Sequence, residues 1–362
     1  MDKNKSEINN RIIQISFFKG IAILMILLCH ASQKFNTPTV FHLIPSFCQM
    51  GCQVFFTISA FSLCMSMDRR NDSLNTFYKR RLKSILPGYW LSIFVYVVFA
   101  LITEHTGGGN FLHINTSPEN IGANLGLIHG LIPTEANNKV VKGGWYIGTL
   151  VILYLLFPLV RMLYIRFTQR KSGIVLILFI QTFSFLCLAL INYVYPSLSL
   201  NNNKFLYFSF INQLPSFCLG IWLFDLYKND RISRVKNPLM KSIILGGASL
   251  FLFFSHKYYS YIFEPGVFSS AFSYMFIYSL QRNIVKDSQL SRVIIELGER
   301  SYAIYLIHPL ILYTGTYLLN IYYHTTLLVY VVWLPISFTI VYYLSIIYNS
   351  IIQKAQSLIF GK

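Results

Sequence analysis

The chain is organised as long runs of apolar residues separated by short polar segments. Ten of these runs have roughly the 20 residues that an α-helix needs to cross a hydrocarbon core about 30 Å thick. The pattern therefore predicts an all-α fold, a polytopic membrane helix bundle of about ten transmembrane helices. The runs cover residues 12–32, 47–67, 84–103, 145–163, 173–195, 205–226, 241–256, 266–281, 298–320 and 326–349.

One apolar segment, IGANLGLIHGLIP at residues 121–133, is too short and too rich in glycine for a span. We expect it to be a re-entrant or interfacial piece. It lies in the longest polar connection, at about 104–144, which contains the loop signals GGG and NTSP. Connections of this length often form lids or binding loops. The sequence has no internal repeat and no room for a separate soluble domain, so we expect a single integral-membrane domain over residues 1–362.

The distribution of charge predicts how the bundle is oriented. The chain has 30 Lys and Arg residues against 13 Asp and Glu, a net charge of +17. In a soluble protein this excess would suggest nucleic acid as a partner, but in a membrane protein it marks cytoplasmic loops that face anionic lipid. Ten spans place both termini on one side, and 25 of the 30 basic residues fall on that side, which predicts cytoplasmic termini. The other five are Lys34, Lys139, Lys142, Lys204 and Lys257.

Composition excludes several further classes. Only 12% of the residues are charged, whereas soluble domains carry about 25%. The six Cys residues are scattered and form no C-x-x-C or Cys/His cluster, so we expect neither a metal site nor a disulfide framework. The basic start MDKNKSEINNR runs straight into an apolar segment without a small-residue cleavage site, so we expect no signal peptide.

The first span carries two ionisable residues, Lys19 and His30. Eleven residues at about 100° each make three turns and about 20°, so both side chains lie on one helix face, roughly 16 Å apart along the axis. Lys19 would lie at the cytoplasmic boundary and His30 well inside the bilayer, where an ionisable residue is a functional hypothesis. The alternative is that Lys19 extends to the membrane surface and His30 only caps the outer end.

Three other segments contain candidate polar residues. Six basic residues precede the third span, among them Arg80, Arg81 and Lys83, and they fit either the usual cytoplasmic charge or a cradle for a phosphorylated ligand. Trp145 and Tyr146 open the fourth span, where an aromatic belt at the outer interface is the simpler interpretation.

In the ninth span, Pro309 follows His308. The proline frees a backbone carbonyl in the preceding turn, and His308 can satisfy that local polar need. Ser301, at the start of the same span, can cap the helix. On this interpretation both residues are structural.

Six motifs in this order resemble those of the acyltransferase family 3 membrane proteins, and they extend over nearly the whole chain. They are KGIAI to His30 (19–30), GCQVFFTISAF (51–61), RRLKSILPGYW (80–90), GWYIGTLVILYLLFPL (144–159), NQLPSFCLGIWL (212–223) and LGERSYAIYLIHPLIL (297–312). The chain departs from the family pattern at several positions: Lys19 for Arg, Ala60 for Gly, Ser84 for Arg, Leu150 for Glu, and Asn212 or Gln213 where some members have Arg. Leu150 excludes a carboxylate role at its position.

The resemblance implies a bacterial inner-membrane O-acyltransferase. Similar proteins transfer an acyl group, usually acetyl from cytosolic acetyl-CoA, to a hydroxyl of a cell-surface or lipid-linked glycan. Coenzyme A is polyanionic, so Lys19, Arg80, Arg81 and Lys83 are expected at a basic cytoplasmic mouth that binds it. His30 is expected to deprotonate the acceptor hydroxyl as a general base. Direct transfer of this kind needs no bound cofactor and no acyl-enzyme.

Alternatives remain open within and outside this family. An acyl-enzyme on Ser59 or Ser301 would need a base within hydrogen-bond reach. Trp145 and Tyr146, with Ser301 and His308, are further candidates for binding the acceptor. A different function would be a transporter or flippase of a lipid-linked sugar or acyl donor, although such folds commonly show internal repeats that this sequence lacks.

Overall fold

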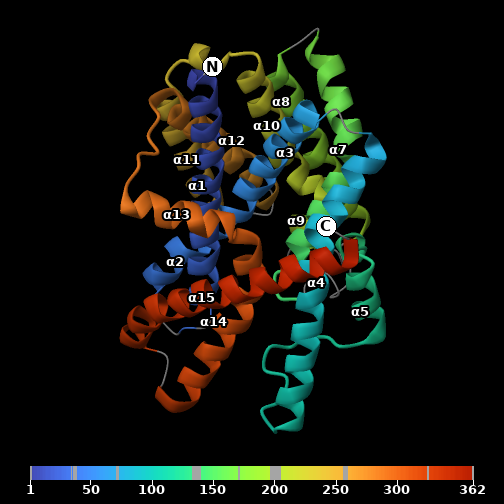
Figure 1. Ribbon diagram of the computed structural model, residues 1–362, viewed down its shortest axis with the longest axis vertical. Coiled ribbons are helices and arrows are strands. Elements are labelled where there is room, and N and C mark those ends of the chain that lie inside the picture. The colour runs from blue at the N-terminus through green and yellow to red at the C-terminus, as the bar shows by residue number, and fades with distance from the viewer. Residues whose placement is uncertain are drawn as a thin grey trace. The chain divides into compact units, whose positions relative to one another are not determined.

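The computed structural model describes residues 2–33, 35, 39–70, 73–132, 140–169, 172–195, 205–255, 260–323 and 326–360, with side chains omitted for 2–12, 39–42 and 260–262. All regular elements in these ranges are helical (Figure 1). Residues 133–139 of the predicted outer loop lie outside the described residues. The same holds for these basic residues of the charge count: Lys34, Lys139, Arg170, Lys171, Lys204, Lys257 and Lys362.

The helices follow one another along the chain. Their bounds are α1 (Asp2–Ser32), α2 (Thr39–Phe47), η1 (Cys48–Met50), α3 (Gly51–Arg70), α4 (Leu74–His105), α5 (Pro118–Leu125), η2 (His129–Leu131), α7 (Trp145–Thr168), α8 (Gly173–Val194), α9 (Phe205–Phe208), α10 (Phe210–Lys228), η4 (Ile232–Arg234), α11 (Pro238–Ser255), α12 (Ser260–Arg282), α13 (Gln289–Glu299), α14 (Ser301–Tyr323) and α15 (Leu327–Phe360).

Within the described ranges, nine helices are long and apolar enough to cross a membrane. They correspond to nine of the ten predicted runs. The remaining run, 266–281, lies in α12, which has 23 residues but contains the buried Glu264. The short segment predicted at 121–133 contains the end of α5 and all of η2, and neither helix is long enough to span. The predicted all-α membrane bundle is therefore confirmed.

The chain divides into two compact units, each built from three separate stretches of sequence. Unit 1 contains residues 1–19, 52–77 and 149–295, and unit 2 contains residues 20–51, 78–148 and 296–362. The boundaries fall inside α1, α3, α4, α7 and α13, so the units are not successive domains along the chain.

Buried polar side chains connect α3 to α10 inside unit 1. Gln53 Nε2 donates to Gln213 Oε1 over 3.0 Å, and Thr57 Oγ1 donates to the carbonyl of Ser216 over 3.0 Å. All four residues are shielded from solvent. Membrane helices commonly use such interhelical hydrogen bonds, because lipid supplies no hydrophobic force that would press apolar helix faces together.

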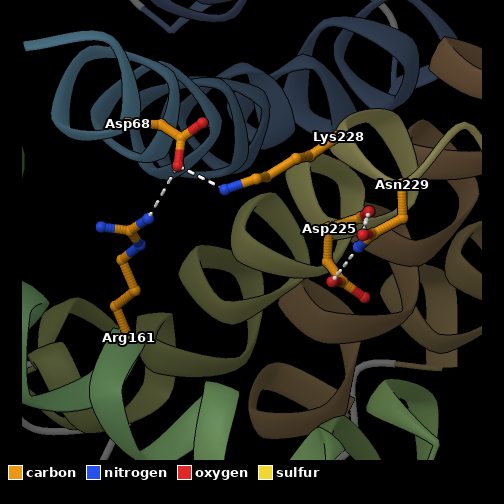
Figure 2. Close-up of polar contacts among 5 residues, drawn as sticks. All are labelled: Asp68, Arg161, Asp225, Lys228 and Asn229. Carbon is orange, nitrogen blue, oxygen red and sulfur yellow. Dashed lines mark hydrogen bonds and ion pairs between the residues drawn. The ribbon is translucent and has the colours of Figure 1, made fainter.

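A charged cluster joins three helices of unit 1 (Figure 2). Asp68 of α3 lies between Lys228 of α10, at 2.5 Å, and Arg161 of α7, at 3.6 Å. Beside it, Asn229 donates to the Asp225 carboxylate over 2.8 Å. The Arg161 side chain is only 18% exposed. Water therefore stabilises its positive charge less than that of a surface residue, and the ion pair with Asp68 matters more.

Replacing Asp68 with Ala should destabilise unit 1 by about 1–2 kcal/mol, because it leaves the half-buried Arg161 without its counter-ion. The expected result is a lower thermal unfolding midpoint of the detergent-solubilised protein. Asp287→Ala is the matched control, since Asp287 forms a 2.7 Å ion pair with Arg292 in which both side chains are mostly exposed. An equal loss in the two variants would contradict a special contribution from Asp68.

In unit 2, α4 and α14 run side by side in the same direction. Tyr302, at the start of α14, donates to the carbonyl of Ile85 over 2.6 Å, and further along Tyr96 donates to the carbonyl of Leu306 over 3.4 Å. Tyr348 of α15 also contacts α4, with its hydroxyl 2.7 Å from Ser92 Oγ. These contacts connect the first turns of α14, and part of α15, to α4.

Candidate functional site

Unit 2 brings the two span histidines together. The rings of His30, on α1, and His308, on α14, have centroids 5.1 Å apart and planes inclined by 47°. His308 is fully buried, whereas His30 is partly accessible. The two residues come from opposite ends of the sequence, and the sequence did not predict that their rings would lie together.

Hydrogen bonds on one ring nitrogen orient His30. Its Nδ1 lies 2.7 Å from the Tyr313 hydroxyl and 3.2 Å from Gln33 Oε1. Tyr313 also donates to Gln33 Oε1 over 2.7 Å. Because that hydroxyl has a single proton, Nδ1 of His30 is the donor to the Tyr313 oxygen in this arrangement. The Nε2 atom of His30 then carries a lone pair.

His308 has the same tautomer for a simpler reason. Its Nδ1 is 3.1 Å from the carbonyl of Ile304, which can only accept. Its Nε2 is buried and has no hydrogen-bond partner among the described residues. The expected local polar contact is therefore present, in the preceding turn of the helix, with the carbonyl of Ile304 as an acceptor. The contact occupies only one of the two ring nitrogens.

Tyr305 links the pair to the turn that precedes α7. Its hydroxyl donates to the carbonyl of Gly143 over 2.6 Å. Its ring lies 5.7 Å from His308 and 5.1 Å from Tyr146, measured between centroids. Trp145 and Tyr146 are 8% and 6% exposed, so they are packed inside the protein and do not form a lipid-facing aromatic belt.

The segment after α5 supports the same turn. His129, fully buried in η2, stacks on Tyr89 with centroids 5.4 Å apart and planes at 16°. Its Nε2 is 3.0 Å from the carbonyl of Gly144 and 3.1 Å from the Tyr89 hydroxyl. Burial lowers the pKa of His129, and the carbonyls of Gly144 and Ala123 partly oppose this by favouring the protonated ring.

The predicted basic segment is helical and partly buried. Arg80, Arg81 and Lys83 lie in the first turns of α4, with Nε of both arginines shielded from solvent. Pro87 cannot donate to the carbonyl of Lys83, four residues earlier. Gln356 of α15 donates to it instead, over 3.2 Å.

The basic segment is separated from the histidine pair by a definite length of helix. The side chain of Tyr302 contacts Gly88. His308 lies six positions after Tyr302 on α14, and Arg81 lies seven positions before Gly88 on α4. At 1.5 Å per residue this corresponds to roughly 20 Å along the two axes. Lys19 and His30 lie on one continuous helix, α1, about 16 Å apart by the same measure. Lys19 belongs to unit 1 and is half-exposed.

The two serine candidates differ from expectation. Ser301 is the first residue of α14, but its hydroxyl makes no hydrogen bond within the described chain, so the predicted cap is not found. Ser59 lies on α3 in unit 1 and likewise shows no histidine or carboxylate partner among the described residues. The structure therefore offers no activated serine nucleophile in the part of the chain that it describes.

Several residues of the site were not predicted from the sequence: Gln33, Tyr89, Asn124, His129, Gly143, Tyr305 and Tyr313. Gln33 and Tyr305 had a usable signal, because each is three residues from a span histidine and shares its helix face. The others are brought to the site by packing between elements distant in sequence.

The family model described as an acyltransferase domain matches residues 12–350 of the chain. No curated protein and no solved structure matches the chain significantly.

Proposed function

Because the chain belongs to acyltransferase family 3, we propose that it is a membrane O-acyltransferase that uses cytosolic acyl-CoA, acetyl-CoA in the simplest case. The acceptor is a hydroxyl of a cell-surface or lipid-linked glycan, and the protein resides in a bacterial cell membrane. The observation that carries this proposal is the His30–His308 pair, in which two Nε2 lone pairs lie inside an apolar bundle. A hydroxyl needs such a base to become a nucleophile.

In the proposed reaction, Nε2 of His30 takes the proton of the acceptor hydroxyl while its oxygen attacks the thioester carbonyl carbon. The new C–O bond forms and the C–S bond breaks. The thiolate of coenzyme A leaves and receives the same proton from His30. Gln33 and Tyr313 hold Nδ1 of the ring throughout, as the orienting groups of a general base do.

Nε2 of His308 is proposed to accept a hydrogen bond from the glycan substrate. This contact would orient the reacting hydroxyl of the glycan toward His30. The two rings act as a pair that holds at most one extra proton. Two positive charges about 5 Å apart repel each other by about 3 kcal/mol at an effective dielectric constant of 20. The proton taken from the acceptor therefore stays available for the leaving thiolate.

The donor is proposed to lie along α4 and α14. Arg80, Arg81 and Lys83 bind the phosphates of coenzyme A, for which arginine forks are well suited. Lys19 is proposed as a fourth basic residue that binds the donor, as expected from the sequence. The roughly 20 Å between Arg81 and His308 suits a donor with a charged head and a long pantetheine arm that ends in the thioester.

The test of this function is to delete the gene and compare O-acyl esters on the surface glycans of the two strains by NMR. Loss of one class of ester, restored by the wild-type gene, is the expected result. The gene for the His105→Ala variant is the matched control for His30 variants, and it should also restore the ester. This substitution removes an exposed histidine at the end of α4. Unchanged ester content, with loss of a lipid-linked glycan from the outer surface, would favour transport.

A further inference from the structure

We infer that His129 is a positioning residue. It holds the turn at residues 143–146 and, through Tyr305, the ring of His308 in the geometry that acyl transfer uses. The inference rests on the proposed function and adds a residue that contacts neither the donor nor the acceptor in the proposed mechanism.

The direction of the hydrogen bonds shows that His129 is a donor. Tyr89 gives its only proton to Asn124 Oδ1, over 2.6 Å, and Asn124 Nδ2 donates to the carbonyl of Asn120 over 2.8 Å, which fixes the amide orientation. The other neighbour of His129 Nε2, the carbonyl of Gly144, can only accept. Both groups that face Nε2 are therefore acceptors, and Nε2 must carry a proton.

The ring cannot shift without moving the turn. A Cβ added at Gly148, in the first turn of α7, would lie 2.8 Å from His129 Nε2, and one added at Gly144 would lie 2.8 Å from the Tyr89 hydroxyl. The opposite contact of the imidazole is the stacked ring of Tyr89. His129 is thus held between the ring of Tyr89 and the backbone at Gly144 and Gly148, where no side chain can move aside.

The turn at residues 143–146 also sets the position of Tyr305. Gly143, one residue before the carbonyl that His129 binds, accepts the Tyr305 hydroxyl over 2.6 Å. The Tyr305 ring packs against both His308 and Tyr146. A displacement of the turn by about 1 Å is therefore passed to His308, and errors of that size cost about a hundredfold in rate in positioned active sites.

Two substitutions separate positioning from simple packing. In His129→Gln the side-chain NH₂ reaches about as far as Nε2 and keeps a donor, whereas the amide of His129→Asn reaches only as far as Nδ1. Both variants lose the aromatic stack on Tyr89. A difference between them therefore reports the hydrogen bond to Gly144.

The experiment uses the purified full-length protein in detergent. Hydrogen–deuterium exchange is read on peptides covering residues 141–148, where the amides of Gly144 and Ile147 are hydrogen-bonded within the turn. Transfer of labelled acetyl from acetyl-CoA to the glycan fraction of wild-type membranes is measured in parallel. We expect His129→Asn to exchange faster in this segment and to show a kcat at least about tenfold below that of His129→Gln, with the KM for acetyl-CoA within about twofold. Tyr305→Phe should lower kcat less in the His129→Asn background than in the wild type. Both substitutions act through the same chain of contacts, so their effects should not add.

Equal exchange and equal rates in the Gln and Asn variants would overturn the inference. So would faster exchange in His129→Asn without a lower kcat. A wild type that forms no ester would refute the proposed function instead, while the exchange data would still decide whether His129 holds the turn. If His129→Asn does not accumulate, Tyr305→Phe alone tests the link, and an unchanged kcat in that variant would overturn it.

Discussion

His30→Ala should abolish acyl transfer while the protein still accumulates in the membrane. General bases contribute about 10²–10⁴-fold to the rate, and the lone pair of His30 Nε2 is the group placed to act. The side chain is only partly buried, so its loss leaves a small cavity and does not expose a buried charge. The measurement is the transfer of labelled acetyl from acetyl-CoA to membrane glycan, normalised to protein in the membrane.

Two comparisons make this result specific. Tyr313→Phe keeps the imidazole and removes one of its two orienting groups, so it should reduce the rate by about tenfold and leave Gln33 in place. His105→Ala should leave the rate unchanged, because this histidine is exposed at the end of α4. Full activity in His30→Ala would refute the general-base mechanism.

The Arg80→Gln/Arg81→Gln double variant should raise the KM for acetyl-CoA by at least about tenfold with a smaller change in kcat. Each hydrogen bond to a charged group contributes about 1.5–3 kcal/mol, and the two arginines are proposed to contact the donor's phosphates far from the reacting carbon. The expected loss is in binding, since the histidine pair lies roughly 20 Å away along the helices. Steady-state rates across acetyl-CoA concentrations provide the measurement.

Lys79→Gln is the matched control for this prediction. Lys79 lies on the same helix and next to Arg80 in sequence, but its side chain is exposed. Its loss should leave the KM within about twofold of wild type. An equal rise in KM for Lys79→Gln would show that only the total positive charge of this surface matters, and would contradict specific contacts from Arg80 and Arg81.

The spans were predictable from hydropathy, but the ends of the helices were not. The third span was predicted to begin at residue 84, whereas α4 begins at Leu74, and the last was predicted to end at residue 349, whereas α15 continues to Phe360. Apolar runs report the part of a helix that lipid can cover. Good helix formers such as Lys, Arg and Gln extend a helix beyond that part without an apolar signal. This is why Arg80, Arg81 and Lys83 were expected ahead of the third span and are found on α4.

The candidate site was predictable only in part. The 100° step of a helix was enough to place Lys19 and His30 on one face of one span. Nothing local to His308 indicated that its ring would lie 5.1 Å from that of His30, because this contact depends on how α1 packs against α14. The role of His129 was still less visible, since a short apolar segment with one histidine shows no periodicity from which its partners can be derived.

The hydrogen bond from Gln356 to Lys83 has a practical consequence for anyone who shortens this protein. The matched family region ends at residue 350, yet the amide that replaces the donor lost at Pro87 comes from beyond it. A chain cut at the family boundary would lose the Gln356 side chain and with it the hydrogen bond to the Lys83 carbonyl. An affinity tag fused directly after residue 356 would interfere with the contact between Gln356 and Lys83. The N-terminus, or a linker placed after residue 360, is therefore the safer site of attachment.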